Sequence, residues 1–291
     1  MMSPQFLNRI APSFTLFIDH EMLYKGNGFV NVNSGQLYQT EDPNFPDKKI
    51  YSSPYRQFVA DSSVIGANIP SGVSAGNVII NKGSSGLYID YDMGRTIFNG
   101  SAPSNLNNLK LSYAYKEYNV YYNESQDEEL IFEAKYPVRP TDNYGNIANT
   151  PLQHDQVTYP AIFVKSQYTE NLPFAFGGLD ETVLDIRCIF LADSPYLLDA
   201  GVSIATDMAR KYFPVLHPKD MPFNIYGDYK NGLNYNFNNL YSQYCQTGSL
   251  MALVESVKIS RFAPSVNKLL GNNAYGGFAD FTVKYVRQPR L

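Results

Sequence analysis

Residues 182–192, Thr-Val-Leu-Asp-Ile-Arg-Cys-Ile-Phe-Leu-Ala, alternate between apolar and more polar positions, and a helix start signal follows almost at once. A β-strand points successive side chains to opposite faces, so every second residue shares a face. One face of this stretch holds Leu184, Ile186, Cys188 and Phe190. The pattern therefore predicts a long strand with one side in the core.

The helix signal is the pair Ser194 and Pro195. Serine is a favoured N-cap residue, and proline is favoured at the first helical position, where its missing N–H costs nothing. Apolar residues then recur on one helical face until Pro214: Leu198, Val202, Ala205, Ala209 and Tyr212. We predict a helix over 194–213 that packs on the core face of the strand 182–192.

Three more strands surround this unit, at 161–167, 251–261 and 277–287. The last strand alternates most regularly, with Phe278, Asp280, Thr282, Lys284 and Val286 on one face and Ala279, Phe281, Val283 and Tyr285 on the other. The order strand, strand, helix, strand, strand favours an α+β fold, an antiparallel sheet with one packed helix.

A small all-β unit is predicted upstream, over 34–108, a stretch rich in Gly, Pro, Asn and Ser. Its best signal is the hairpin 86–98, Gly-Leu-Tyr-Ile-Asp-Tyr-Asp-Met-Gly-Arg-Thr-Ile-Phe, in which Gly94 can adopt the positive φ of a turn. Weaker strand signals lie at 55–60 and 77–80, and 109–122 is expected to return from the unit as one long strand. We therefore expect an α+β domain of residues 1–33 and 109–291, with 34–108 as an inserted or appended β-rich unit.

The remaining segments give weaker signals. A helix is expected over 14–25, after Ser13 and closed by Gly26, although strands could also begin near Phe29. Another helix is expected after Asn123 and before Pro137. The segments 137–158, 172–178 and 214–250 are expected to be loops; the first is either an arm that orders on a neighbouring subunit or a disordered connector.

Composition favours a subunit of an assembly. Charged residues make up only 17% of the chain, while Tyr (24) and Phe (18) are plentiful, which suits a surface largely covered by neighbours. The net charge of −4, with no basic run, argues against a protein that grips phosphate backbones. No secretory signal or long apolar run is seen, so assembly in a cytoplasm is expected, with no membrane partner.

No motif predicts catalysis, a cofactor or a metal site. Adjacent residues in Asp19-His20-Glu21 point in different directions, so a solvated polar patch is expected there. Asp90 and Asp92 share a face near the hairpin turn, where a turn alone explains them better than a bound cation. Cys188 is expected to be a buried thiol, and a disulfide with Cys245 is not expected. Tyrosines over 113–122 and 226–244 are expected to fill cores and interfaces rather than to stack on sugars or bases.

Three short segments resemble sequences of a known class of protein. They are Pro-Tyr-Arg-Gln-Phe-Val at 54–59, Ile-Pro-Ser-Gly-Val at 69–73, and Asp-Tyr-Asp-Met-Gly-Arg at 90–95. Together with the order of elements over 159–287, they resemble tail-terminator and neck proteins of tailed phages. The resemblance implies a non-enzymatic virion subunit, assembled in the host cytoplasm, that closes a hexameric ring at the neck or tail. Its partners would be further copies of itself and neighbouring neck or tail proteins, with DNA passing through a central channel without being held.

Aromatic loops are the expected subunit contacts because such side chains are costly to leave in water. The residues chosen are Tyr144, Phe174, Phe176, Phe223, Tyr226 and Tyr229. One rival interpretation is a baseplate or fibre-attachment protein whose β unit binds a carbohydrate. Another is a hydrolase that uses Asp90 and Asp92.

Overall fold

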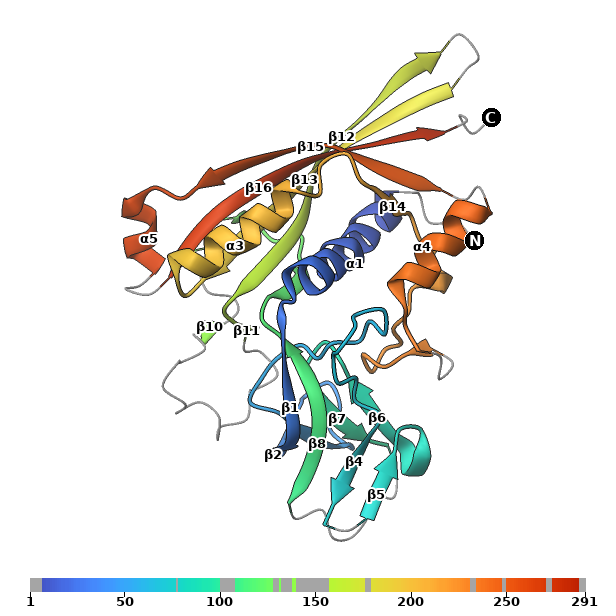
Figure 1. The fold of residues 1–291 in the computed structure, drawn as a ribbon, viewed down its shortest axis with the longest axis vertical. Coiled ribbons are helices and arrows are strands. Elements are labelled where there is room, and N and C mark those ends of the chain that lie inside the picture. The colour runs from blue at the N-terminus through green and yellow to red at the C-terminus, as the bar shows by residue number, and fades with distance from the viewer. Residues whose placement is uncertain are drawn as a thin grey trace.

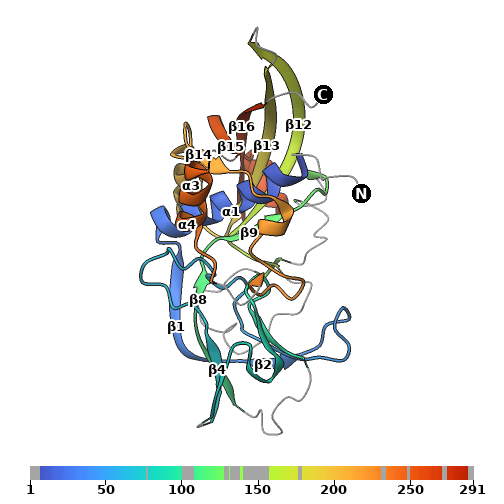
Figure 2. The ribbon, with the colours of Figure 1, turned by 90° about the vertical axis from the view of Figure 1, so that its right-hand side faces the viewer.

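The protein has an elongated α+β fold, as the sequence predicts (Figure 1). This computed structural model describes residues 7–76, 78–99, 108–127, 131, 138–139, 157–175, 179–230, 234–247, 250–270 and 274–287. A large sheet with its helices occupies one end of the long axis, and two smaller sheets occupy the other (Figures 1 and 2).

The large sheet has six strands in the order β14-β15-β16-β13-β12-β9. Their bounds are β9 Asn119–Tyr122, β12 Ala161–Ala175, β13 Leu179–Ala192, β14 Tyr212–Pro214, β15 Met251–Arg261 and β16 Tyr275–Arg287. All neighbouring pairs are antiparallel except β9 and β12. The four long strands confirm the predicted antiparallel sheet, but β12 continues through residues 172–175, which were expected to be a loop.

One face of this sheet is covered by α1 (Leu7–Gly26) and α3 (Pro195–Thr206). As predicted, Ser194 caps α3, its side chain accepting a hydrogen bond from the N–H of Leu197. Leu198, Val202 and Ala205 are buried in the same cluster as Leu184, Ile186 and Phe190. On α1, the ring of Phe14 meets those of Phe213 and Phe281 edge-on, at centroid distances of 5.5 and 4.9 Å. These contacts make the helix layer and the sheet one core.

The predicted end of α3 at Phe213 is wrong, because the chain leaves the helix at Thr206. Arg210 has a positive φ of 65°. Its N–H donates to the carbonyl of Val254, and the N–H of Val254 donates to the carbonyl of Lys211. Pairing with the large sheet thus replaces the last predicted helical turn, and 212–214 becomes strand β14.

The opposite face of the sheet is partly covered by the short helix α5 (Pro264–Leu270). Phe262 and Phe278 meet there edge-on at 4.7 Å. Beyond α5 this face carries ion pairs between neighbouring strands. Arg187 donates to Asp280 at 2.7 and 3.2 Å, and Lys284 lies 2.7 Å from Glu255. The alternation predicted for 277–287 is confirmed, with Ala279, Phe281, Val283 and Tyr285 buried.

The smaller sheets have the orders β1-β8-β4-β5 and β2-β3-β7-β6. Their strands are β1 Phe29–Gln36, β2 Tyr38–Thr40, β3 Lys49–Ser52, β4 Gly72–Ala75, β5 Val78–Asn81, β6 Leu87–Asp90, β7 Arg95–Phe98 and β8 Leu109–Lys116. The predicted hairpin is confirmed as β6 and β7. Two-residue strands β10 (Val138–Arg139) and β11 (Val157–Thr158) pair in parallel.

Several predicted elements differ from the structure. The expected single strand 109–122 is two strands in different sheets, separated where the N–H of Glu117 donates to the carbonyl of Gly28. Segment 55–60 forms no strand, only one bridge between Phe58 and Tyr115. Residues 214–250, expected to be loop, contain α4 (Phe237–Gln246), capped by Asn236, and the 3₁₀ turn η2 (Pro218–Asp220); another, η1, spans Ser84–Gly86.

The N-terminal helix exists but begins at Leu7, so Ser13 is not its cap. Inside α1 the Ser13 hydroxyl donates to the carbonyl of Arg9 and accepts from the N–H of Leu216. Of the helix expected after Asn123, residues 124–126 are not helical, Asp127 and Ile131 are helical, and the remaining residues lie outside the described ones. Most of the expected arm 137–158 lies outside the described residues.

Candidate functional site

The predicted contact residues lie in different settings. Phe174 is 53% exposed on β12, within the hairpin of β12 and β13 that projects from the body (Figures 1 and 2). Two exposed apolar residues, Tyr168 and Leu172, lie on the same strand. Tyr144 and Phe176 lie outside the described residues. The projecting hairpin thus presents an aromatic and aliphatic surface to solvent.

The segment 223–229 folds back onto the small sheets. Tyr229 is only 4% exposed, and its hydroxyl donates to the carbonyl of Ala60. Tyr226 stacks on Tyr88 with ring centroids 4.6 Å apart, and Phe223 stacks on Tyr229 at 6.1 Å. These three aromatics therefore pack within the chain, and Phe223 also borders a cavity.

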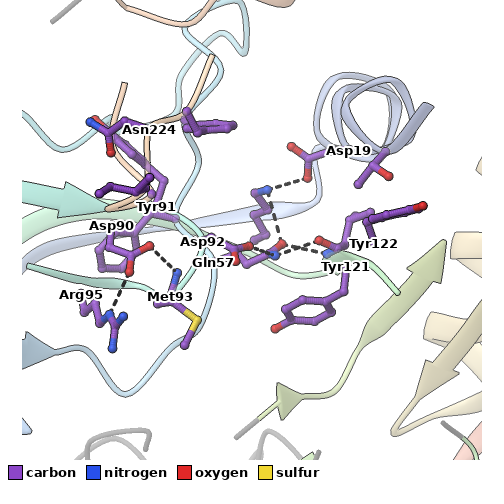
Figure 3. A pocket seen from close by; sticks show the side chains of 18 of the residues that line it. Asp19, Gln57, Asp90, Tyr91, Asp92, Met93, Arg95, Tyr121, Tyr122 and Asn224 are labelled. Carbon is purple, nitrogen blue, oxygen red and sulfur yellow. Dashed lines mark hydrogen bonds and ion pairs between the residues drawn. The ribbon is translucent and has the colours of Figure 1, made fainter. Parts of the chain in front are cut away.

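This cavity, of about 650 Å³, lies where α1, the β6–β7 turn, β9 and the 223–227 segment meet (Figure 3). Its walls combine aromatic rings with carboxylates and amides. They include Phe45, Asp92, Tyr121, Tyr122, Phe223 and Asn224. No single stretch of sequence forms it, because the wall residues come from six separate parts of the chain.

The β6–β7 turn is held by close backbone packing and by buried charges. Gly94 has a φ of +61°, and a Cβ there would lie 1.8 Å from the carbonyl oxygen of Arg56. Arg95 donates through Nε to Asp90 at 2.8 Å and through Nη1 to Asp42 at 2.6 Å. Burial raises the pKa of Asp90 to about 6, although Arg95 opposes the rise. Asp90 is therefore part of an internal ion cluster.

Asp92, two residues further, is exposed and accepts a hydrogen bond from Nε2 of Gln57 at 2.6 Å. The same nitrogen donates to the carbonyl of Val120 at 2.8 Å, and Oε1 of Gln57 accepts from the N–H of Val120 at 2.8 Å. Gln57 thus ties the hairpin turn to β9, as Figure 3 shows. The sequence prediction missed this role, although Gln57 lies in the 54–59 window that contributed to the resemblance.

The solvated patch expected at Asp19-His20-Glu21 is wrong, because all three side chains are buried. Each has its own partner, as their different directions on a helix require. Asp19 accepts from Lys116 at 2.6 Å, and Glu21 accepts from Lys211. Burial raises the pKa of Asp19, with Lys116 opposing the rise.

The partner of His20, the third of these buried residues, is Asp61. Nδ1 of His20 lies 2.7 Å from Oδ2 of Asp61, and the His20 ring stacks on Phe237 at 4.4 Å. Asp61 also accepts from the backbone N–H of Ser63 and of Phe237, which lower its pKa together with His20 against the effect of burial. The three residues therefore join α1 to the neighbouring loops and to α4.

Across the described ranges, no group of three or more His, Cys, Asp or Glu side chains is arranged to hold a metal ion. Cys188 and Cys245 are both free, and Cys188 is buried as predicted. Burial raises the pKa of the Cys188 thiol. Within the same ranges, no helix combines the length and apolar character needed to span a bilayer.

The two features that could act on another molecule are the projecting hairpin and the cavity. The hairpin offers exposed apolar side chains and backbone hydrogen-bonding groups, and the cavity offers aromatic faces beside Asp92. No protein-family model matches the chain, and no curated protein sequence matches it.

Proposed function

We propose that this chain is a non-enzymatic structural protein of a tailed-phage virion, a subunit that closes a ring at the neck or tail as a tail terminator or connector. Its partners are further copies of itself, six to a ring, and the adjoining neck or tail proteins. The observation that carries the proposal is the large sheet, in which part of each edge has no strand partner among the described residues.

At one edge, β9 pairs only with residues 161–164 of β12, so residues 166–175 have no outer strand partner within the described chain. At the other edge, β14 pairs only with residues 251–253 of β15, which leaves 256–261 without one. Unpaired strand edges are templates for pairing with another chain. This sheet therefore has one open edge on each side.

Two different edges favour a head-to-tail contact, which closes a ring when the rotation between copies allows it. The strands β12, β13, β16 and β15 alternate in direction, so β12 runs antiparallel to β15. A copy rotated about an axis parallel to the strands then presents its β15 antiparallel to β12 of its neighbour. Exposed Leu172 and Phe174 add apolar area beside this edge.

The ion-paired face of the sheet suits a channel through which DNA passes. Arg187 is held by Asp127 and Asp280, and Lys284 by Glu181 and Glu255. Lys165 shares Asp127 with Arg187, so three cations meet four carboxylates in these ion pairs, which leave no excess positive charge with which to bind phosphates. Such a surface supports passage of a duplex without retention.

The test is to examine the purified chain by native mass spectrometry and negative-stain electron microscopy. We expect sixfold rings. Tyr168→Ser, on the free part of β12, should weaken the ring without changing the melting temperature. Tyr196→Ser, at a still more exposed tyrosine on α3, should leave the ring intact. Monomers alone at concentrations that favour assembly, together with absence of the chain from virus particles, would contradict the proposal.

The cavity favours a second candidate function, a baseplate or fibre-attachment protein that binds a carbohydrate. Its volume of about 650 Å³ is typical of small-molecule sites, and Tyr121, Tyr122 and the carboxylate of Asp92 all line it. Aromatic faces with nearby hydrogen-bond acceptors suit sugar rings. If this candidate is correct, we expect the chain to form a trimer and to bind glycans on an array. Asp92→Asn and Tyr122→Ala should each abolish that binding. Rings without glycan binding would exclude it.

A further inference from the structure

The β4–β5 hairpin lies at the end of the long axis opposite the β12–β13 hairpin (Figure 1). β5 is the last strand of its sheet and pairs only with β4 among the described residues. Its outer residues Val78 and Ile79 are 62% and 72% exposed. Among the described residues, this end of the molecule therefore shows both apolar side chains and a strand edge without a partner.

Among the described residues, the β5 edge lacks the features that limit pairing at edge strands. Soluble proteins protect edge strands with charged residues, proline, bulges or a covering loop. Residues 70–81, which include β4 and β5, contain no charged side chain, and no proline follows Pro70.

The free edges of the large sheet carry charged residues, so each selects a partner strand of opposite charge, such as the other edge of the next copy. The free part of β12 contains Glu170 and Pro173, and the free part of β15 contains Lys258 and Arg261. The edge strand β1 is covered by a loop, since Asn31 donates to the carbonyl of Gly66 and accepts from the N–H of Asn68. Among the described residues, β5 differs from these edges because it carries neither a charged residue nor a covering loop.

We infer that β5 is a docking edge for an extended, uncharged strand of a different protein, the component that adjoins this end of the ring. The inference rests on the proposed function, because it places the chain in a particle with such neighbours. Pairing would extend the sheet β1-β8-β4-β5 by one strand, with main-chain hydrogen bonds giving the contact and side chains giving the selectivity.

The side chains of β5 indicate which residues a partner strand would contain. Val78 and Ile79 are adjacent in a strand, so they point to opposite faces of the sheet. An added strand meets an apolar side chain on both of its faces, and a charged residue in it would lose water without gaining an ion pair. The partner segment is therefore rich in apolar, β-branched residues.

The length of β5 argues against a second copy of this chain as the partner. Two copies paired through these four residues alone would bury far less than the roughly 1,200–2,000 Å² of a stable interface. Around a ring, however, the same short edge is repeated in every subunit. Once one subunit of the ring is bound to a partner surface with repeated strands, the other subunits are held close to it at a high effective concentration. Several weak contacts can then add up to stable binding.

The test places the photo-crosslinking residue p-benzoylphenylalanine at position 79, and at position 65 as a matched control, in particles of the virus that encodes the chain. Ile65 is 87% exposed but lies in a turn and not on a strand edge. We expect position 79 to cross-link to one other structural protein, within an uncharged β-strand, and position 65 to give no such product.

A second arm compares Ile79→Lys with Ile65→Lys. A lysine on the edge should lower incorporation into particles at least about tenfold, whereas the control stays within about twofold. Unchanged melting temperatures establish that both variants fold; if Ile79→Lys does not, the cross-linking arm decides alone.

The inference is overturned if position 79 cross-links two copies of this chain, reaches a charged surface, or gives no product in particles that contain the protein. Rings that are present in such particles would then leave the proposed function standing. Absence of the chain from particles would remove the proposed function and this inference with it.

Discussion

The side chain of Gln57 forms with Val120 the two hydrogen bonds that a neighbouring strand would form. Its Nε2 donates to the carbonyl of Val120, and its Oε1 accepts from the N–H of Val120, both at 2.8 Å. Gln57 is 2% exposed and Val120 5%. A side-chain amide thus satisfies the backbone of β9 on the side that no strand covers, close to where the chain leaves one sheet for another.

We expect Gln57→Leu to lower the free energy of unfolding by about 2–4 kcal/mol, because it leaves the buried N–H and C=O of Val120 without these partners. Urea denaturation measures the loss. The control Gln39→Leu, at an exposed site on β2, should change stability by less than about 0.5 kcal/mol. If Gln57→Leu lowers the free energy of unfolding by no more than the control does, water replaces the two hydrogen bonds of Gln57 without loss of stability.

Gly94→Ala should destabilise the fold by more than about 3 kcal/mol, since the new Cβ would lie 1.8 Å from the carbonyl oxygen of Arg56 in addition to the strain of positive φ. Gly66→Ala is the matched control, with a φ of +87° and no atom within 4 Å of its Cβ. It carries only the backbone strain, about 1–2 kcal/mol. Thermal melting of both variants separates the two effects, and equal losses would contradict the close packing.

Leu198→Ala should cost about 2–5 kcal/mol, because Leu198 is buried between α3 and the large sheet. Leu198→Asp should prevent folding, since it buries a carboxylate with no partner. Tyr196→Ala, two residues earlier and 80% exposed, should be nearly neutral. Circular dichroism and melting temperatures check all three. A folded Leu198→Asp chain with the parent's melting temperature would show that α3 packs through another face.

The pKa of Asp90 is raised to about 6 in the folded protein, above its ordinary value of 3.8. The folded state therefore holds this proton more tightly, and the resulting stabilisation is complete below the ordinary pKa and is lost as the pH rises through about 6. Asp90→Asn removes this dependence, so the stability of the parent relative to the variant should fall between pH 4 and 7 by up to about 3 kcal/mol.

Urea midpoints at several pH values, with the exposed Asp47→Asn as control, measure that dependence. A parent that becomes more stable relative to Asp90→Asn as the pH rises would mean that the ion pair with Arg95 outweighs burial.

The sequence predicts elements well where local chemistry and tertiary packing agree. The hairpin of β6 and β7 combines alternating side chains with Gly94 at the turn, and α3 combines a serine cap with proline at its first position. Strand β15 has the predicted bounds, Met251–Arg261.

Other features depend on contacts between distant residues. The alternation over 109–122 is nearly continuous, yet Glu117 bonds to Gly28 and the chain changes sheets there. Helix α4 is rich in Asn and Tyr, so its weak apolar pattern is typical of a loop, and its position depends on the bond from the N–H of Phe237 to Asp61. The cavity could not be predicted for the same reason, since Gln57 and Asp92 meet only in the folded chain.

The central position of β8 has a mechanical consequence. β1 and β8 run along the long axis and connect the small sheets to the rest of the molecule, and β4 pairs with β8 through Val73, Ser74 and Ala75 (Figure 1). Tension applied at the β4–β5 end along that axis acts parallel to these strands. It loads the hydrogen bonds between β4 and β8 simultaneously, in shear, instead of opening them one at a time. This end of the molecule can therefore bear a pulling force that would readily peel apart a sheet attached across the axis.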